Sequence, residues 1–124
     1  MQKFIFNNIG WQEPIFLCHT TSKQEDLHDP LSNYLYINQR NNQIRLFIDV
    51  PSGTKLSMQY TYDSEDVIRK SIRNVEWINH EVGTITSDFV DMLNGPPTAI
   101  RLKIKELPTD QMVSVEIMKG NLND

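Results

Sequence analysis

Cys18 and His19 are adjacent in the sequence, and a thiol beside an imidazole is a combination that nucleophilic catalysis uses. Such chemistry needs the base within hydrogen-bonding reach of the thiol, with a third group to orient the base. We expect both residues to lie in one β-strand, where successive side chains point to opposite faces of the sheet. The two side chains therefore cannot easily pair, and Cys18 is interpreted as a small buried side chain.

The remaining histidines and carboxylates do not show the spacing of a metal site. His19, His28 and His80 are scattered along the chain without a paired His-x-x-x-His spacing. The acidic segment 25–29 is interpreted as a solvated loop, and the segment 63–66 as a helix cap, because it lacks the glycine and the terminal glutamate of a calcium loop. We predict no catalytic residue, no metal and no cofactor. An enzyme would need a cleft where His28 or His80 meets carboxylates.

Aromatic side chains are the most suggestive candidates for binding. Planar rings exposed on a sheet stack sugars or anchor a protein partner. Trp11 follows Gly10 in a predicted turn, which favours an exposed ring. Tyr60 and Tyr62 continue an apolar stripe and are expected in the core instead. The predicted binding residues are Trp11, Trp77, Tyr34 and Tyr36.

The charges argue against binding to nucleic acid. The chain has 12 Lys and Arg against 16 Asp and Glu, for a net charge of -4, whereas affinity for phosphate backbones comes from clustered basic residues. Arg101, Lys103 and Lys105 form a basic stripe along one predicted strand. An acidic partner is one interpretation of this stripe, but a solvated face that also blocks edge aggregation is favoured.

Alternation of apolar and polar side chains predicts the strands that must position these groups. The clearest example places Ile44, Leu46 and Ile48 on one face. The four strongest strands cover residues 43–50, 55–62, 98–106 and 111–119. The last two are expected to form a hairpin, because Pro108 suits a tight turn between them.

The rest of the chain gives shorter elements. Further strands are predicted near residues 3–6, 14–20 and 33–38. The amide-rich segment 39–42 is expected to close a hairpin, because asparagine tolerates left-handed backbone angles, and the polar segment 22–30 is expected to be a surface loop.

Two segments fit both helix and strand patterns. Residues 63–66 carry helix-capping chemistry, so a short helical turn is expected there, followed by a strand over 72–78. Residues 87–94 are predicted as a short helix that Ser87 caps and Gly95 ends.

These elements predict an all-β, mainly antiparallel fold, either a β-sandwich or a jelly roll. About seven or eight short strands are separated by turn signals, with one or two short helices. A chain of 124 residues suits one domain, expected over residues 1–124.

The sequence also bears on location. Cys18 is the only cysteine, so no internal disulfide can form. The first residues do not form a signal peptide, and no apolar run is long enough to span a bilayer. We therefore expect the protein to fold in the cytoplasm and not to bind a membrane.

Two functions are compatible with these observations. The first is a non-enzymatic structural or interaction protein, such as an accessory subunit of a phage or virus particle, whose partners are other protein subunits, including copies of itself. It is favoured by the lack of a chemical motif, the β-rich pattern and the abundant amides, as in residues 38–43. The alternative is a carbohydrate-binding module, which requires at least two exposed, coplanar aromatic rings.

Overall fold

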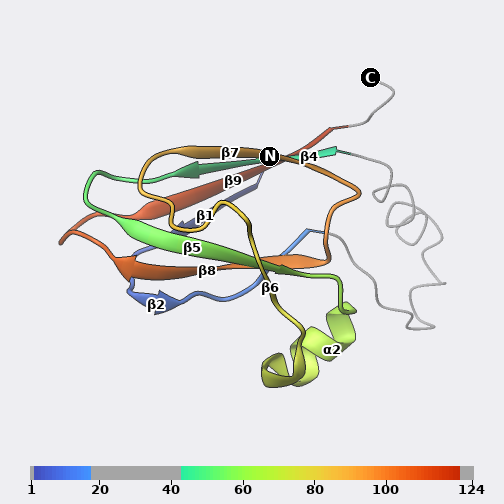
Figure 1. Cartoon of the computed structure of the whole chain (residues 1–124). Coiled ribbons are helices and arrows are strands. Elements are labelled where there is room, and N and C mark those ends of the chain that lie inside the picture. Colours follow the sequence, from blue (N-terminus) through green and yellow to red (C-terminus); the bar gives the residue numbers. More distant parts are fainter. Residues whose placement is uncertain (1, 18–42, 121–124) are drawn as a thin grey trace.

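The computed structural model describes residues 2–17 and 43–120, which form two antiparallel sheets packed face to face (Figure 1). The prediction of an all-β sandwich is therefore confirmed. The helices within the described residues are all too short or too polar to cross a bilayer. The predictions for Cys18, His19, His28, Tyr34 and Tyr36, and those for residues 22–42, lie outside the described residues.

The first sheet has four strands in the order β1, β9, β4, β7. These strands are β1 (Gln2–Phe6), β9 (Val113–Gly120), β4 (Gln43–Asp49) and β7 (Phe89–Asn94). The predicted alternation holds, because Ile44, Leu46 and Ile48 are all buried on the inner face.

The second sheet has β8 and β5 at its centre, with β2 and β3 both pairing to β8 and β6 pairing to β5. Its strands are β2 (Gly10–Trp11), β3 (Ile15–Phe16), β8 (Ala99–Glu106), β5 (Lys55–Thr61) and β6 (Ile78–Asn79). Pro14 separates β2 from β3 because it has no N–H to donate to the ladder. On either side of it, the N–H groups of Gln12 and Leu17 still donate to carbonyls of the β8 segment.

The order of the strands within the described residues is that of a jelly roll. If β2 and β3 are counted as two halves of one strand, the first strand pairs with the eighth, the second with the seventh, the third with the sixth and the fourth with the fifth. This pairing, divided between two packed sheets, is the connectivity of the double Greek-key jelly roll.

The sheets share one apolar interior. Its members are the inward side chains of both sheets, together with neighbours from the adjoining loops, and the largest fully buried ones include Leu17, Ile44, Leu46, Ile48, Leu56, Ile100, Leu102, Ile104, Val113 and Val115. Phe4 and Phe6 of β1 and Phe89 and Leu93 of β7 pack against this core from the sheet edges.

The predicted hairpin between the last two strands is wrong, although both strands form. Strand β8 belongs to the second sheet and β9 to the first, so the turn at Pro108 carries the chain from one sheet to the other. Alternation shows which side chains face inward, but two strands that face the same interior from opposite sheets have the same pattern.

The predicted helical turn forms, but the strand expected over 72–78 does not. Helix α2 (Glu65–Lys70) begins after Ser64, whose hydroxyl accepts the Val67 N–H, and the 3-10 helix η2 (Ile72–Asn74) follows it. Ile68 and Val75 are buried with Ala99 in a second small core on the outer face of the five-stranded sheet. A helical turn brings Ile68 and Val75 onto this core while Ile72 remains exposed, so tertiary packing overrides the alternation.

The helix predicted over 87–94 is also wrong, because this segment is strand β7. Phe89 and Leu93 are four residues apart, a spacing that suits one face of a helix or of a strand. Pairing with β4, from Ile48 opposite Phe89 to Gln43 opposite Asn94, determines the outcome. Gly95, with a positive φ of 59°, ends a strand and not a helix.

Two aromatic placements also differ from the predictions. Tyr62 is 62% exposed and not part of the core, because β5 ends at Thr61, and it is Thr61 that turns inward. The Thr61 hydroxyl accepts the N–H of Asp63 and directs the chain towards α2. Trp11 lies in strand β2 and not in a turn, but its ring is 47% exposed.

Candidate functional site

Trp11 and Trp77, two of the predicted binding residues, lie on either side of one arginine. The guanidinium carbon of Arg101 is 3.9 Å from the centre of the Trp11 ring and 4.3 Å from the centre of the Trp77 ring. The pairing of β2 with β8 brings Trp11 to this position, opposite Lys103, whose ammonium lies 5.2 Å from the same ring. We call Trp11, Arg101 and Trp77 the Trp–Arg–Trp stack.

Hydrogen bonds hold the guanidinium of the stack in place. The Nε–H of Arg101 donates to the side-chain oxygen of Gln59 at 2.8 Å, and the amide of Gln59 donates to Asn79 at 2.7 Å. Burial lowers the pKa of the Arg101 guanidinium, but an arginine stays protonated at neutral pH. The stack therefore carries a fixed positive charge on the outer face of the five-stranded sheet, and Arg101 does not belong to a freely solvated stripe.

The geometry of the stack suits packing better than sugar binding. A sugar platform needs two coplanar rings with free faces, whereas each indole here presents a face to the guanidinium. Trp77 is half-buried against the small core of α2, and its indole nitrogen is buried without a hydrogen-bond partner among the described residues. Trp11 is 47% exposed, so part of its surface is accessible to a ligand.

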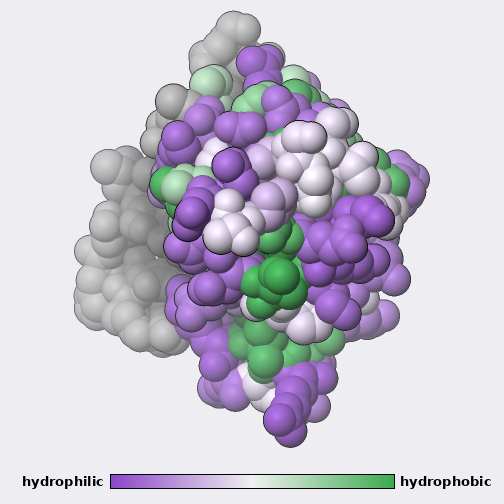
Figure 2. Space-filling view, turned by 90° about the vertical axis from the view of Figure 1, so that its left-hand side faces the viewer, coloured by the Kyte–Doolittle hydropathy of each residue, from purple (hydrophilic) through white to green (hydrophobic). Residues whose placement is uncertain are grey.

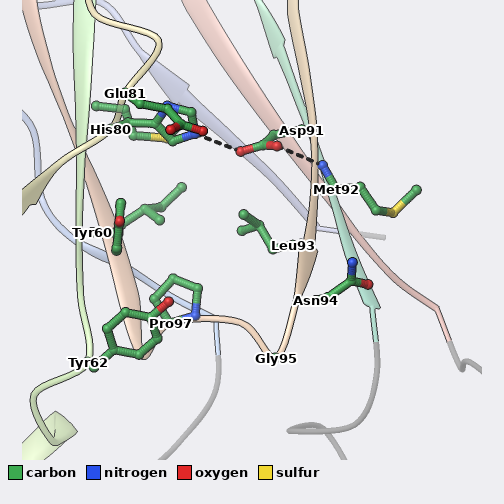
Figure 3. A pocket seen from close by; sticks show the side chains of 12 residues that line it. Tyr60, Tyr62, His80, Glu81, Asp91, Met92, Leu93, Asn94, Gly95 and Pro97 are labelled. Atoms are coloured by element: carbon green, nitrogen blue, oxygen red, sulfur yellow. Dashed lines mark hydrogen bonds and ion pairs between the residues drawn. The ribbon is translucent and has the colours of Figure 1, made fainter.

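A cleft of about 320 Å³ lies on the opposite flank, between β5 and the edge strand β7 (Figure 3). Tyr60 and Tyr62 stand on the β5 side, and Leu93 and Asn94 on the β7 side. We call this space the edge cleft. Its other lining residues are Met58, His80, Glu81, Asp91, Met92, Gly95, Pro97 and Ile100.

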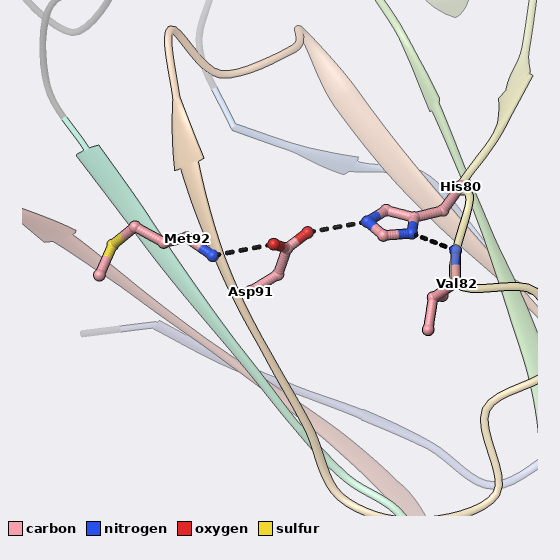
Figure 4. A network of polar contacts seen from close by, with 4 residues as sticks. All are labelled: His80, Val82, Asp91 and Met92. Carbon is pink, nitrogen blue, oxygen red and sulfur yellow. Dashed lines mark hydrogen bonds and ion pairs between the residues drawn. The ribbon is translucent and has the colours of Figure 1, made fainter.

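His80 and Asp91 connect the two sheets across one end of the edge cleft (Figure 4). The Nε2 of His80 is 2.8 Å from the Asp91 carboxylate, and its Nδ1 accepts the N–H of Val82 at 3.0 Å. The ring is therefore assigned as the neutral tautomer with its proton on Nε2, which donates to Asp91. The imidazole also makes edge-to-face contacts with Tyr60 and Phe89.

This pair has the geometry of a structural bridge. Both nitrogens of His80 are occupied, so the ring has no free site at which to take a proton from a substrate. The residues that line the edge cleft include no serine, threonine or cysteine, and no three potential metal ligands come together within residues 2–17 and 43–120. From the sequence, His80 was considered only as a residue of an enzyme cleft. Its contact with Asp91 could not be predicted, because it depends on how the two sheets pack.

The outer face of the four-stranded sheet carries exposed apolar side chains that sequence reasoning missed. Strand pairing places Phe47 beside Val90, and Arg45 between Met92 and Met118. Val90 is 59% exposed and Ile5, on β1, is 55% exposed. We call Ile5, Phe47, Val90, Met92 and Met118 the apolar stripe. The sequence contained a signal for this surface: these apolar residues occupy outward positions in strands whose inward positions are also apolar.

The end of the sandwich with the β4–β5 and β8–β9 connections is more polar than the apolar stripe. Figure 2 shows this end as mainly hydrophilic, with a hydrophobic group near its middle and smaller ones elsewhere. Scattered or narrow apolar exposure of this kind is ordinary for a protein surface.

Comparison with protein-family models, curated proteins and solved structures gives no match. The described residues offer three candidate sites, namely the Trp–Arg–Trp stack, the edge cleft and the apolar stripe.

Proposed function

We propose that the protein is a non-enzymatic assembly subunit that packs through the outer face of its four-stranded sheet against a second copy of itself. The apolar stripe is the observation that carries this proposal. Val90 and Ile5 are more than half exposed, and Met92 and Met118 are 41% and 45% exposed on the same face. Several exposed apolar side chains on one sheet face are a feature of interaction surfaces, although here Arg45 lies between Met92 and Met118.

The charges on this face favour a copy of the same chain as the partner. Lys3 and Glu116 form an ion pair at 3.9 Å across β1 and β9, and Arg45 and Asp49 add one charge of each sign on β4. In a two-fold contact the same patch meets itself, so a face with both signs can offer each charge an opposite one. Methionine side chains adapt readily to such a contact.

The setting we propose is a larger protein assembly, such as a phage or virus particle, after folding in the cytoplasm. Jelly rolls build many capsid subunits, which supports this setting by analogy with the fold alone. The same fold also supports lectins, but the Trp–Arg–Trp stack does not present the coplanar rings that a carbohydrate-binding module needs.

Sedimentation of the wild-type chain at increasing concentration tests the proposal. We expect a monomer–dimer equilibrium, and we expect the double variant Val90→Lys/Met118→Lys to stay monomeric, because it places two charges in the apolar contact. The matched control is Ile72→Lys, since Ile72 is 42% exposed but lies on η2, away from the stripe. A wild-type chain that remains monomeric up to millimolar concentration would refute the proposed contact.

A further inference from the structure

We propose that the edge cleft binds an organic cation, namely the ammonium or guanidinium group of a small amine or of a lysine or arginine side chain. This inference does not depend on the apolar stripe. The cleft lies between β5 and β7, whereas the stripe occupies the outer face of the four-stranded sheet, and Met92 on the edge strand β7 is the residue that both share.

The edge cleft is lined by acidic side chains. Asp91 and Glu81 both line the edge cleft, and none of its lining residues within the described part of the chain is a lysine or an arginine. Glu81 makes no ion pair with any residue in the described part of the chain. Asp91 accepts hydrogen bonds from His80 and from the Met92 N–H, and a carboxylate has room for about four such bonds. Among residues 2–17 and 43–120, no lysine or arginine of the lining balances the negative charge of this cleft.

Two tyrosines form an aromatic wall of the edge cleft. The rings of Tyr60 and Tyr62 meet edge to face with their centres 5.8 Å apart on the β5 side of the cleft. Aromatic ring faces attract cations, most strongly where water is partly excluded. Leu93 adds an apolar side chain to the lining, and the alkyl part of a lysine or arginine side chain can pack against such a side chain.

Size and desolvation narrow the ligand further. A volume of about 320 Å³ is at the lower end for small-molecule sites, and it suits one side chain or a small amine. An anion would face two carboxylates. A neutral ligand such as a sugar would displace water from Asp91 and Glu81 without compensating their charge, which costs free energy. A cation is attracted to the two carboxylates and compensates their charge when water is displaced.

The proposal is tested by titrating the full chain with Nα-acetyl-lysine methylamide while backbone amide resonances are recorded by NMR. We expect saturable shifts at cleft positions such as Tyr60, Asn94 and Gly95. The matched neutral probe is Nα-acetyl-norleucine methylamide, which has a methyl group in place of the ammonium. We expect it to bind at least about tenfold more weakly, because it loses both the charge pairing and the ring contact.

Variants then assign the binding to these side chains. Glu81→Gln and Tyr62→Leu change exposed residues and should leave the fold intact, yet each should weaken lysine binding severalfold. Glu76→Gln makes the same charge change on an exposed residue outside the cleft and should leave the affinity unchanged.

Three results would overturn the proposal: equal binding of the norleucine probe, equal effects of Glu81→Gln and Glu76→Gln, or saturable binding of N-acetylglucosamine but not of the lysine probe. Butylammonium distinguishes the two sources of the cation. Affinity equal to that of the lysine probe would assign the cleft to a free amine, and weaker binding would assign it to a side chain of a partner protein.

Discussion

Replacing Arg101 tests whether the Trp–Arg–Trp stack holds the outer face of the five-stranded sheet together. The most informative change is Arg101→Met, which keeps most of the alkyl stem but removes the charge, the planar group and the Nε donor. Arg101→Lys keeps the charge and removes only the planar fork and its hydrogen bond to Gln59. Lys105→Met is the control, because Lys105 lies on the same strand and is exposed.

The expected magnitude follows from the contacts of the guanidinium. Each cation–π contact contributes about 0.5–1 kcal/mol at a partly exposed site, and the hydrogen bond from a charged donor contributes about 1.5 kcal/mol. Part of this gain offsets the desolvation that lowers the pKa of Arg101. We therefore expect Arg101→Met to reduce the free energy of unfolding by about 2 kcal/mol, and Arg101→Lys to reduce it by about 1 kcal/mol.

Urea unfolding followed by far-UV circular dichroism measures these differences without relying on tryptophan fluorescence. Lys105→Met should stay within about 0.5 kcal/mol of the wild type. A double-mutant cycle of Arg101→Met with Trp11→Ala should give a coupling of about 0.5–1 kcal/mol. Additive effects in that cycle, or an Arg101→Met loss no larger than that of the control, would refute the assigned role of the stack.

Two further predictions concern the sandwich itself. His80→Ala removes the bridge between the sheet edges, so we expect a loss of about 1–2 kcal/mol and amide exchange that accelerates more in β6 and β7 than in β4 and β9; uniform acceleration would contradict this. Leu46→Ala should cost about 3 kcal/mol in urea unfolding because Leu46 is fully buried, whereas Val90→Ala on the outer face of the same sheet should cost less than about 1 kcal/mol; equal losses would contradict the assignment of the two faces.

The core of the sandwich was predictable from the sequence because burial follows a two-residue period. The inward positions of β4, β8 and β9 are buried as expected, from Ile44 to Ile117. Pairing between strands was not predictable in the same way. The hairpin expected at Pro108 is instead a crossing between sheets, because the periodicity of a strand does not specify the sheet to which it belongs.

The wrong elements are those whose pattern fits two structures. The spacing of Phe89 and Leu93 fits a helix or a strand. The segment forms a strand because it pairs with β4. Residues 72–78 alternate like a strand, but burying Ile68 and Val75 over Ala99 stabilises a helical turn there. In both segments, a partner distant in sequence outweighs the local preference.

The candidate sites were predictable only as single residues. Trp11 and Trp77 were identified as binding candidates by residue type, but their shared contact with Arg101 depends on the pairing of β2 with β8. The contact of His80 with Asp91 and the arrangement of the apolar stripe depend in the same way on strand pairing and sheet packing, which one sequence does not reveal.

The pairing of first and last strands has a consequence for biosynthesis. Strand β9 lies between β1 and β4, with Gln2 opposite Ile117, so the four-stranded sheet cannot assemble until the C-terminal strand has left the ribosome. Until then the apolar sides of β1 and β4 lack the neighbour that joins them. Folding slows as contacts become more distant along the chain, so we expect the pairing of β9 with β1 and β4 to be a late step in folding.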